Sequence, residues 1–158
     1  MAAGPLEVLQ DFLAHASNPD EVEDAVARFV AADATYVSLS YDDPELNRIM
    51  PWAGTQHGAS VFVENFKGVS KRWTNDSFEV TETIEQDDKV AIFGRFTLRS
   101  VTLGQAAESP FAVFAKVSGG RITYYMYMED TFATARTFRE SGTWTIRADP
   151  SATEPIQV

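Results

Sequence analysis

The stretch RITYYMYMEDT (residues 121–131) is the most informative part of this sequence. Its isoleucine, threonines and tyrosines are typical of a β-strand, yet it ends in two adjacent carboxylates, Glu129 and Asp130. Strands disfavour acidic residues. A carboxylate that faces an apolar interior must be hydrogen-bonded, shifted in pKa, or both. The end of this strand is therefore the first place to look for chemistry.

Other strands precede this stretch. From residue 78 onward the apolar residues recur with the two-residue period of a strand, as Phe78 and Val80 alternate with Glu79 and Thr81. The aspartates at 87–88 and the glycines at 119–120 are typical of tight turns. The pattern predicts four consecutive antiparallel strands over residues 78–85, 90–102, 109–118 and 121–131.

The first half of the sequence is mainly helical. Apolar residues recur with helical spacing over residues 5–16, from residue 18 to about residue 30, and over residues 59–73. A strand is expected at residues 33–40, and prolines and glycines predict a loop for much of residues 41–58. Helices that are segregated from the strands indicate the α+β class. We expect three N-terminal helices to pack on a strongly curved, mainly antiparallel sheet that encloses a pocket.

Composition limits the classes of function. The 158 residues suit one domain, for which we expect residues 1–142, followed by a C-terminal tail over residues 143–158. A net charge of −10 disfavours nucleic acid and membrane surfaces as partners. The sequence has no cysteine, no visible signal peptide and no apolar run long enough to span a membrane. These features predict a cytoplasmic protein.

Two motifs carry a resemblance to a known group of proteins. The run PWAGTQHG (residues 51–58) before the third long helix and the run YMEDT (residues 127–131) on the last strand resemble the nuclear transport factor 2-like (NTF2-like) superfamily. Within it, the chain is similar to the SnoaL-like and ketosteroid-isomerase-like proteins. The resemblance implies a conical fold, a deep pocket and a homodimer formed across the outer face of the sheet. The superfamily contains isomerases, cyclases, dehydratases, epoxide hydrolases and non-catalytic proteins, so the fold alone selects no function.

The sequence departs from ketosteroid isomerase at two positions. The helix at residues 5–16 has no tyrosine to serve as the oxyanion donor of that family, and Ser38 occupies the position of its aspartate base. Asp42 and Asp43, four and five residues further on, are the alternatives for a displaced base. The resemblance to SnoaL-like cyclases, which use an aspartate near the end of the last strand, points to Asp130 instead.

Strict alternation along the last strand also favours Asp130. It would place Ile122, Tyr124, Met126, Met128 and Asp130 on one face, which we expect to face the pocket. Burial would raise the pKa of Asp130 and suit it to general acid or base catalysis. Two alternatives remain: Asp130 caps the segment that follows, or a β-bulge reverses the faces and exchanges Asp130 for Glu129.

Other candidates surround this strand. Histidine as a residue type suits proton transfer, and His57 is expected near the pocket mouth, although it is also compatible with an exposed loop residue. Tyr36 and Tyr41 are candidate donors to an oxyanion. With only two histidines, far apart, we expect no metal and no cofactor. The residues expected to bind an apolar or polycyclic molecule, or else to pack in the core, are Trp52, Tyr36, Phe66, Tyr124, Met126 and Met128.

The strand at residues 90–102 predicts an outer surface. Arg95 and Arg99 alternate with apolar residues, so we expect them to face outward together with Phe93 and Thr97. Phe93, Thr97 and Tyr125 are the expected residues of a dimer interface. A catalytic Arg–Asp couple that resembles that of the epoxide hydrolases is an alternative role for these arginines.

Two functions fit these observations. The first is a cofactor-free enzyme that isomerises, cyclises or dehydrates a small apolar carbonyl compound, with Asp130 or Glu129 moving the proton and Tyr41 or His57 assisting. The second is a non-catalytic ligand-binding or dimerisation domain.

Overall fold

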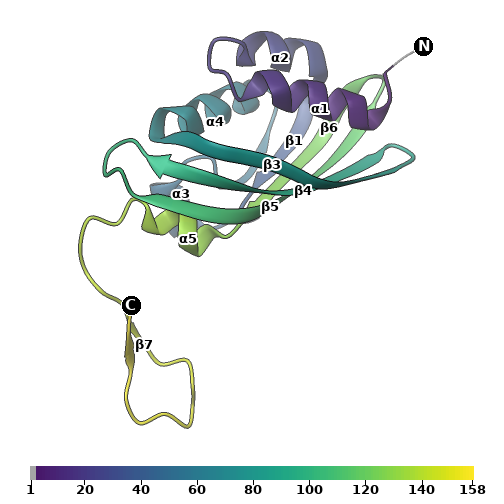
Figure 1. Cartoon of the computed structure of the whole chain (residues 1–158). Coiled ribbons are helices and arrows are strands. Elements are labelled where there is room, and N and C mark those ends of the chain that lie inside the picture. Colours follow the sequence, from purple (N-terminus) through teal and green to yellow (C-terminus); the bar gives the residue numbers. More distant parts are fainter. Residues whose placement is uncertain (1–2) are drawn as a thin grey trace.

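Six strands form one curved sheet, and helices cover one of its faces (Figure 1). The computed structural model describes residues 3–158. The α+β class and the helices packed on a curved, mainly antiparallel sheet are confirmed. In chain order the elements are α1 (Pro5–Ala16), α2 (Val22–Phe29), β1 (Val30–Ser38), α3 (Pro44–Ile49), β2 (Gly54–His57), α4 (Ala59–Arg72), β3 (Trp73–Gln86), β4 (Lys89–Ser100), β5 (Ala106–Ser118), β6 (Arg121–Glu129), α5 (Thr131–Arg136), β7 (Thr145–Ile146) and β8 (Ile156–Gln157).

The sheet has the strand order β2-β1-β6-β5-β4-β3. Strands β3 to β6 follow one another as an antiparallel meander, as predicted, and β1 pairs in parallel with β6. The turns lie where the sequence places them. Asp87 has φ of 54°, and Gly119 and Gly120 have φ of 59° and 74°, which a tight two-residue hairpin turn requires. The last strand therefore lies in the middle of the sheet, between β1 and β5.

The long helices bury their apolar stripes against the sheet. Phe12 of α1 lies edge-on to Phe62 of α4 and to Tyr125 of β6, each at 6.1 Å between ring centroids. The first turn of α1 is tied to the β3–β4 hairpin, because the backbone N–H of Leu6 donates to Oε2 of Glu85 (2.8 Å). Such a bond satisfies one of the free N–H groups at a helix start. The buried stripe of α1 consists of Val8, Leu9, Phe12 and Ala16.

Gly94 allows β3 and β4 to curve. A Cβ atom at this position would lie 2.1 Å from the carbonyl oxygen of Glu79 and 2.6 Å from the ring of Phe111. The register of β3 against β4 also shifts at two places, and such bulges bend a strand and increase its twist. The absence of a side chain at Gly94 and the two bulges together keep the sheet curved beneath the helices.

Two details of the chain differ from the sequence prediction. Residues 41–58 contain α3 and β2 in addition to loop, because Asp43 caps a helix that has Pro44 in its first turn. The Asp43 carboxylate accepts from the N–H groups of Glu45 (3.1 Å) and Leu46 (2.9 Å), which is a typical helix start. The third strand begins at Trp73 instead of residue 78, because its pairing with β4 already starts there.

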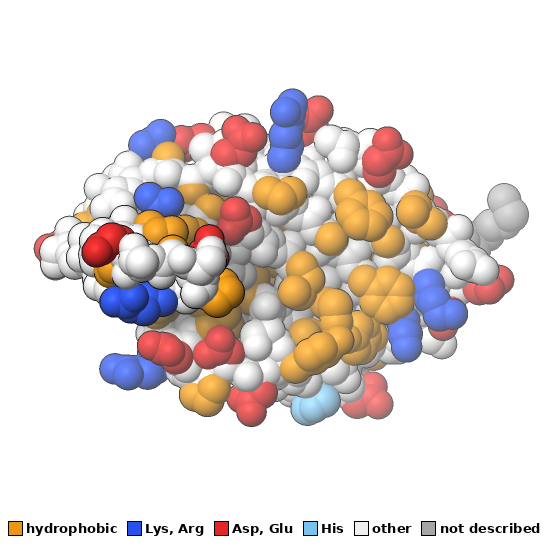
Figure 2. Space-filling view, turned by 90° about the horizontal axis from the view of Figure 1, so that it is seen from below, with side chains coloured by type: hydrophobic (Ala, Val, Ile, Leu, Met, Phe, Trp, Pro, Cys, Tyr) orange, Lys and Arg blue, Asp and Glu red, His pale blue; other side chains and the backbone are white. Residues whose placement is uncertain are grey.

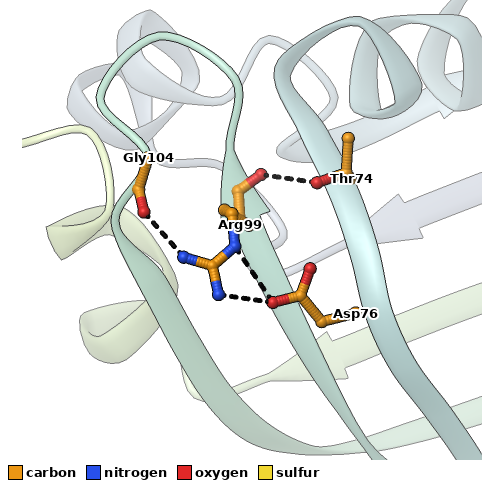
Figure 3. Close-up of polar contacts among 4 residues, drawn as sticks. All are labelled: Thr74, Asp76, Arg99 and Gly104. Carbon is orange, nitrogen blue, oxygen red and sulfur yellow. Dashed lines mark hydrogen bonds and ion pairs between the residues drawn. The ribbon is translucent and has the colours of Figure 1, made fainter.

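The outer face of the sheet carries the arginines of β4. Arg99 donates through Nε (3.1 Å) and Nη2 (2.7 Å) to Oδ2 of Asp76, and through Nη1 to the carbonyl oxygen of Gly104 (2.9 Å) (Figure 3). Arg95 pairs in the same way with Glu79 (2.7 Å). Both pairs are partly exposed and lie outside the cavity described below. These ion pairs join the edge strand β3 to β4. They are not an Arg–Asp catalytic pair in the cavity.

The chain ends in a small hairpin, formed by β7 and β8, that projects away from the sheet (Figure 1). Its contacts with the preceding part of the protein are few. The ring of Trp144 lies edge-on to Phe132 of α5 at 5.5 Å, and Nη1 of Arg139 donates to the carbonyl oxygen of Val158 (3.2 Å). Within residues 3–158, no helix combines the length and the apolar character that crossing a membrane requires.

Candidate active site

A cavity of about 600 Å³ lies between α1, α4 and the inner face of the sheet. Its walls are largely apolar and aromatic, with Trp52 and Phe66 on one side and residues of β3, β4 and β6 on the other. Among the described residues that line it, Glu129 is the one charged side chain. Such a cavity suits a neutral ligand with a few polar groups, since an apolar wall with one polar end fixes orientation.

Glu129 faces the cavity because β6 contains a bulge. Lys116 of β5 pairs with Tyr124, whereas the next residue of β5 pairs with Ile122, so Thr123 is an extra residue in β6. Beyond the bulge the inward residues are therefore Tyr125, Tyr127 and Glu129. The expectation of strict alternation was wrong, and the bulge alternative describes the strand.

The half-buried carboxyl of Glu129 has a perturbed pKa. Burial, with a smaller contribution from the charge of Asp130, raises this pKa from 4.5 to about 7, against a hydrogen bond from Thr134 that lowers it. Oγ1 of Thr134 lies 2.9 Å from Oε1 of Glu129. A carboxyl group with a pKa near neutrality exists in both protonation states at physiological pH, which suits it to accept and return a proton.

Three tyrosines line the cavity together with Glu129. Tyr36 of β1 stacks on Tyr125 of β6 at 5.5 Å, and Tyr127 stacks on Phe111 at 5.9 Å. Burial raises the pKa of Tyr36, Tyr125 and Tyr127 above the ordinary value for tyrosine, and the charge of Glu129 adds to the shift of Tyr36 and Tyr127. Their hydroxyl groups therefore keep their protons at neutral pH and can donate hydrogen bonds to an oxygen in the cavity.

Asp130 does not face the cavity. Its side chain is exposed and accepts a hydrogen bond from the N–H of Ala133 (3.0 Å), so that it caps α5. Its own N–H donates to Oγ of Ser109 (2.8 Å). The capping alternative is confirmed, and the expected inward orientation of this carboxylate was wrong.

The expected pocket residues divide into two groups. Trp52, Tyr36 and Phe66 line the cavity. The expectation for the remaining three was wrong, because the bulge turns their side chains to the opposite side of the sheet; these residues are Tyr124, Met126 and Met128. For the same reason Tyr125, expected on the outer face, is buried with 2% of its surface exposed.

His57 and Tyr41 lie outside the cavity. His57 is exposed at the end of β2, where Nδ1 contacts Oγ1 of Thr35 (3.3 Å). Tyr41 is 69% exposed and borders a separate, more polar pocket beside α3. The structure therefore does not bring either residue together with Glu129.

Several lining residues were not anticipated from the sequence. Tyr127, Ser38, Trp73 and Asn75 all border the cavity. Tyr127 faces the cavity because of the bulge in β6, for which the sequence carries no local signal. Over residues 3–158, no group of three or more histidine, aspartate or glutamate side chains is arranged to hold a metal ion.

The apolar outer face of the sheet is the other large feature. The residues paired across β4, β5 and β6 on this side form what we call the outer patch, and hydrophobic side chains gather over this face (Figure 2). Phe93 and Met128 are each 41% exposed. The outer patch consists of Phe93, Ala112, Phe114, Met126 and Met128.

Comparison with known proteins agrees with this architecture. Residues 9–125 match the family described as the SnoaL-like domain. A relative from Penicillium expansum, named patulin biosynthesis cluster protein F, is 38% identical over 125 residues. The matched region covers 77% of this chain and 63% of that protein, so the chain spans less than two thirds of the relative's length.

Solved structures share the fold at low sequence identity. An NTF2-like protein from Burkholderia xenovorans LB400 has a TM-score of 0.72 and 21% identity, over 88% of this chain and 98% of that chain. TerC, crystallised with polyporic acid, has a TM-score of 0.67 and 21% identity, over 84% of this chain and 96% of that chain. With the fold, the cavity and the matched residues in agreement, this chain belongs to the SnoaL-like family and has the NTF2-like fold.

Proposed function

We propose that this protein is a cofactor-free acid/base catalyst that moves a proton next to the carbonyl group of a small, largely apolar compound. The product would arise by isomerisation, cyclisation or dehydration. One observation carries the proposal: the carboxyl of Glu129, whose pKa is about 7, lies in an apolar, aromatic cavity. Membership of the SnoaL-like family supports it.

The reaction needs a base that removes a proton from carbon and hydrogen-bond donors that stabilise the carbonyl oxygen. The carboxylate of Glu129 takes the proton from the carbon beside the carbonyl, and the electron pair of the broken C–H bond moves onto the carbonyl oxygen. Tyr36 and Tyr127 donate hydrogen bonds to the developing oxyanion, in a site with few polar groups where such bonds are strong. The protonated carboxyl then returns its proton to another carbon or to a leaving oxygen.

The lining limits the substrate class. The described lining residues include no lysine, arginine or histidine, so a substrate carboxylate would lose water without gaining a counter-charge. We therefore propose a neutral, ring-containing ketone or enol. The relative named for patulin biosynthesis supports an intermediate of natural-product synthesis as its source.

A second copy of the chain is the proposed partner of the outer patch. The patch is apolar in a chain of net charge −10, and its side chains pair in register across three strands. Contiguous exposed apolar surface of this kind marks interaction sites.

Exchange of the acidic C–H protons of β-tetralone in heavy water, followed by proton NMR, tests the proposed chemistry without knowledge of the natural substrate. The wild-type protein should accelerate exchange, and the Glu129→Gln variant should lose about 100-fold to 10,000-fold of that acceleration. Asp130→Asn is the matched control, because asparagine also caps helices and the side chain lies outside the cavity; it should keep the acceleration, with the pH dependence moved to lower pH because the charge of Asp130 raises the pKa of Glu129. Equal rates in the wild type and Glu129→Gln would contradict the proposal.

A non-catalytic ligand-binding role is the second candidate, favoured by the largely apolar lining. In that case β-tetralone should bind, as measured by calorimetry, with no acceleration of exchange above the rate in buffer.

A further inference from the structure

We propose that Thr134 is the positioning residue of the site: its hydroxyl holds Oε1 of Glu129, so that Oε2 is the oxygen that exchanges protons with a ligand in the cavity. This assignment rests on the proposed function for its catalytic meaning, but its geometry is independent of any substrate. Thr134 lies on α5, does not line the cavity, and has 0% of its surface exposed.

The hydroxyl of Thr134 has a choice of acceptors. Oγ1 lies 2.9 Å from Oε1 of Glu129, 3.2 Å from the carbonyl oxygen of Asp130 and 3.4 Å from that of Thr131. One hydroxyl has one hydrogen to donate, and a bond to a charged acceptor is about twice as strong as one to a neutral acceptor. The hydrogen is therefore directed to Glu129 when the carboxylate is ionised. When the carboxyl is neutral, the helix carbonyls remain within reach.

Thr134 is itself fixed by the hydrogen bonds of α5. At the start of the helix, the carboxylate of Asp130 accepts from the N–H of Ala133 (3.0 Å), and the N–H of Asp130 donates to Oγ of Ser109 (2.8 Å). At its end, Oγ1 of Thr137 donates to the carbonyl oxygen of Thr134 (2.7 Å) and accepts from Nε1 of Trp73 (2.8 Å). Hydrogen bonds at both ends of α5 thus fix the position of Thr134. The bonds at the C-terminal end include Trp73, which lines the cavity.

The groups around Glu129 oppose its ionisation, which gives the bond from Thr134 a function. The titratable groups that face the carboxyl are Tyr36 from β1, Tyr127 from β6 and Asp130 at the start of α5, and none of them is a cation. Burial and the charge of Asp130 raise the pKa of Glu129, and the hydrogen bond from Thr134 lowers it. Without that bond, the carboxyl would hold its proton too strongly to act as a base at neutral pH.

The pKa of Glu129 in substituted proteins tests the assignment directly. The glutamate carboxyl carbons are labelled and titrated by NMR, and the resonance of Glu129 is identified by its loss in Glu129→Gln. Thr134→Val removes the hydroxyl at nearly constant shape and should raise the pKa of Glu129 by about one pH unit. Thr134→Ser retains the donor and should restore the wild-type pKa.

Thr131→Val is the control, because it removes a threonine hydroxyl from another position of α5. Oγ1 of Thr131 is 3.5 Å from the backbone oxygen of Glu129 and makes no bond to its carboxyl, so the pKa should stay at the wild-type value. An unchanged pKa in a folded Thr134→Val protein would overturn the assignment. If Thr134→Val does not fold, Thr134→Ala provides the same measurement with the hydroxyl also removed.

The titration also separates this inference from the proposed function. If the pKa rises in Thr134→Val and the exchange of β-tetralone shifts its pH dependence upward by the same amount, both stand. If the pKa rises while no protein in the series accelerates exchange, the positioning role of Thr134 stands and the proposed catalysis fails.

Discussion

Glu129 and Asp130 are neighbours in the chain, yet their carboxyl groups lie in different environments. Glu129, the last residue of β6, lines the cavity and accepts a hydrogen bond from Thr134. Asp130 is exposed and caps α5. The two acids therefore have different roles. Glu129 is available for chemistry, and Asp130 caps the helix whose Thr134 binds Glu129.

The raised pKa of Glu129 predicts a specific dependence of stability on pH. The folded protein holds this proton up to about pH 7, whereas the unfolded chain releases it near 4.5. Between these two values the folded state binds more protons, so this group's contribution to the free energy of unfolding falls as pH rises. The free energy of unfolding is measured by urea denaturation for the wild type and Glu129→Gln. The value for the variant minus that for the wild type should rise by roughly 2–3 kcal/mol between about pH 4 and about pH 8. A constant difference between the two proteins would contradict the raised pKa.

Removing the cap of α5 should weaken folding without removing the carboxyl in the cavity. Asp130→Ala should lower the free energy of unfolding by about 1 kcal/mol, because the N–H of Ala133 loses its acceptor. Asp43→Ala in α3 is a matched comparison, since that carboxylate also caps a short helix. Loss of β-tetralone exchange in Asp130→Ala, with the fold intact, would return Asp130 to the list of catalytic candidates.

Two substitutions of glycine by alanine should have opposite effects. Gly94→Ala places Cβ 2.1 Å from the carbonyl oxygen of Glu79, so we expect a loss of more than about 2 kcal/mol or failure to fold. In Gly68→Ala, on α4, the nearest atoms to the new Cβ are 3.7 Å away, and alanine should stabilise the helix by about 0.5–1 kcal/mol. Denaturation in urea measures both, and similar stabilities for the two variants would refute the role given to Gly94 in the curvature.

Charge on the outer patch should dissociate the proposed homodimer. Met128→Lys places an ammonium group among apolar side chains, and burying it between two copies would cost several kcal/mol. Light scattering should therefore find the wild type as a dimer and the variant as a monomer. Ile49→Lys on α3, where the side chain is 43% exposed, is the control and should remain a dimer. A monomeric wild type at high concentration would reject the proposal.

The terminal hairpin should be dispensable for the fold. A chain that ends at residue 142 loses the contact between Trp144 and Phe132 and the bond from Arg139 to Val158, both of which lie outside the cavity. We expect it to remain folded, with a melting temperature only a few degrees lower. Circular dichroism and thermal melting measure this, and an unfolded product would show that residues 1–142 are not an independent domain.

Periodicity predicted most of the fold, because each helix and strand of the core buries one face. The stripe of α1 and the turn at Gly119 and Gly120 lie where the sequence places them. The faces of β6 were predicted wrongly because Thr123 is an extra residue relative to β5. Such a bulge depends on how two strands fit together, and no local pattern of residues marks it.

The same limit applies to Thr134. Its hydroxyl reaches Glu129 only because the chain turns from a strand into a helix at Asp130. The sequence therefore identified a pair of acids and an apolar pocket, whereas the choice between the acids needed the three-dimensional arrangement.

The parallel pairing of β1 with β6 has a consequence for how the chain reaches its native state. Tyr36 of β1 lies beside Tyr125 of β6, so the centre of the sheet joins segments far apart along the polypeptide. Contacts of such long sequence separation slow folding, because a long loop must close before they form. During synthesis on the ribosome, β2 can pair with one edge of β1 early, whereas the other edge stays unpaired until β6 has emerged.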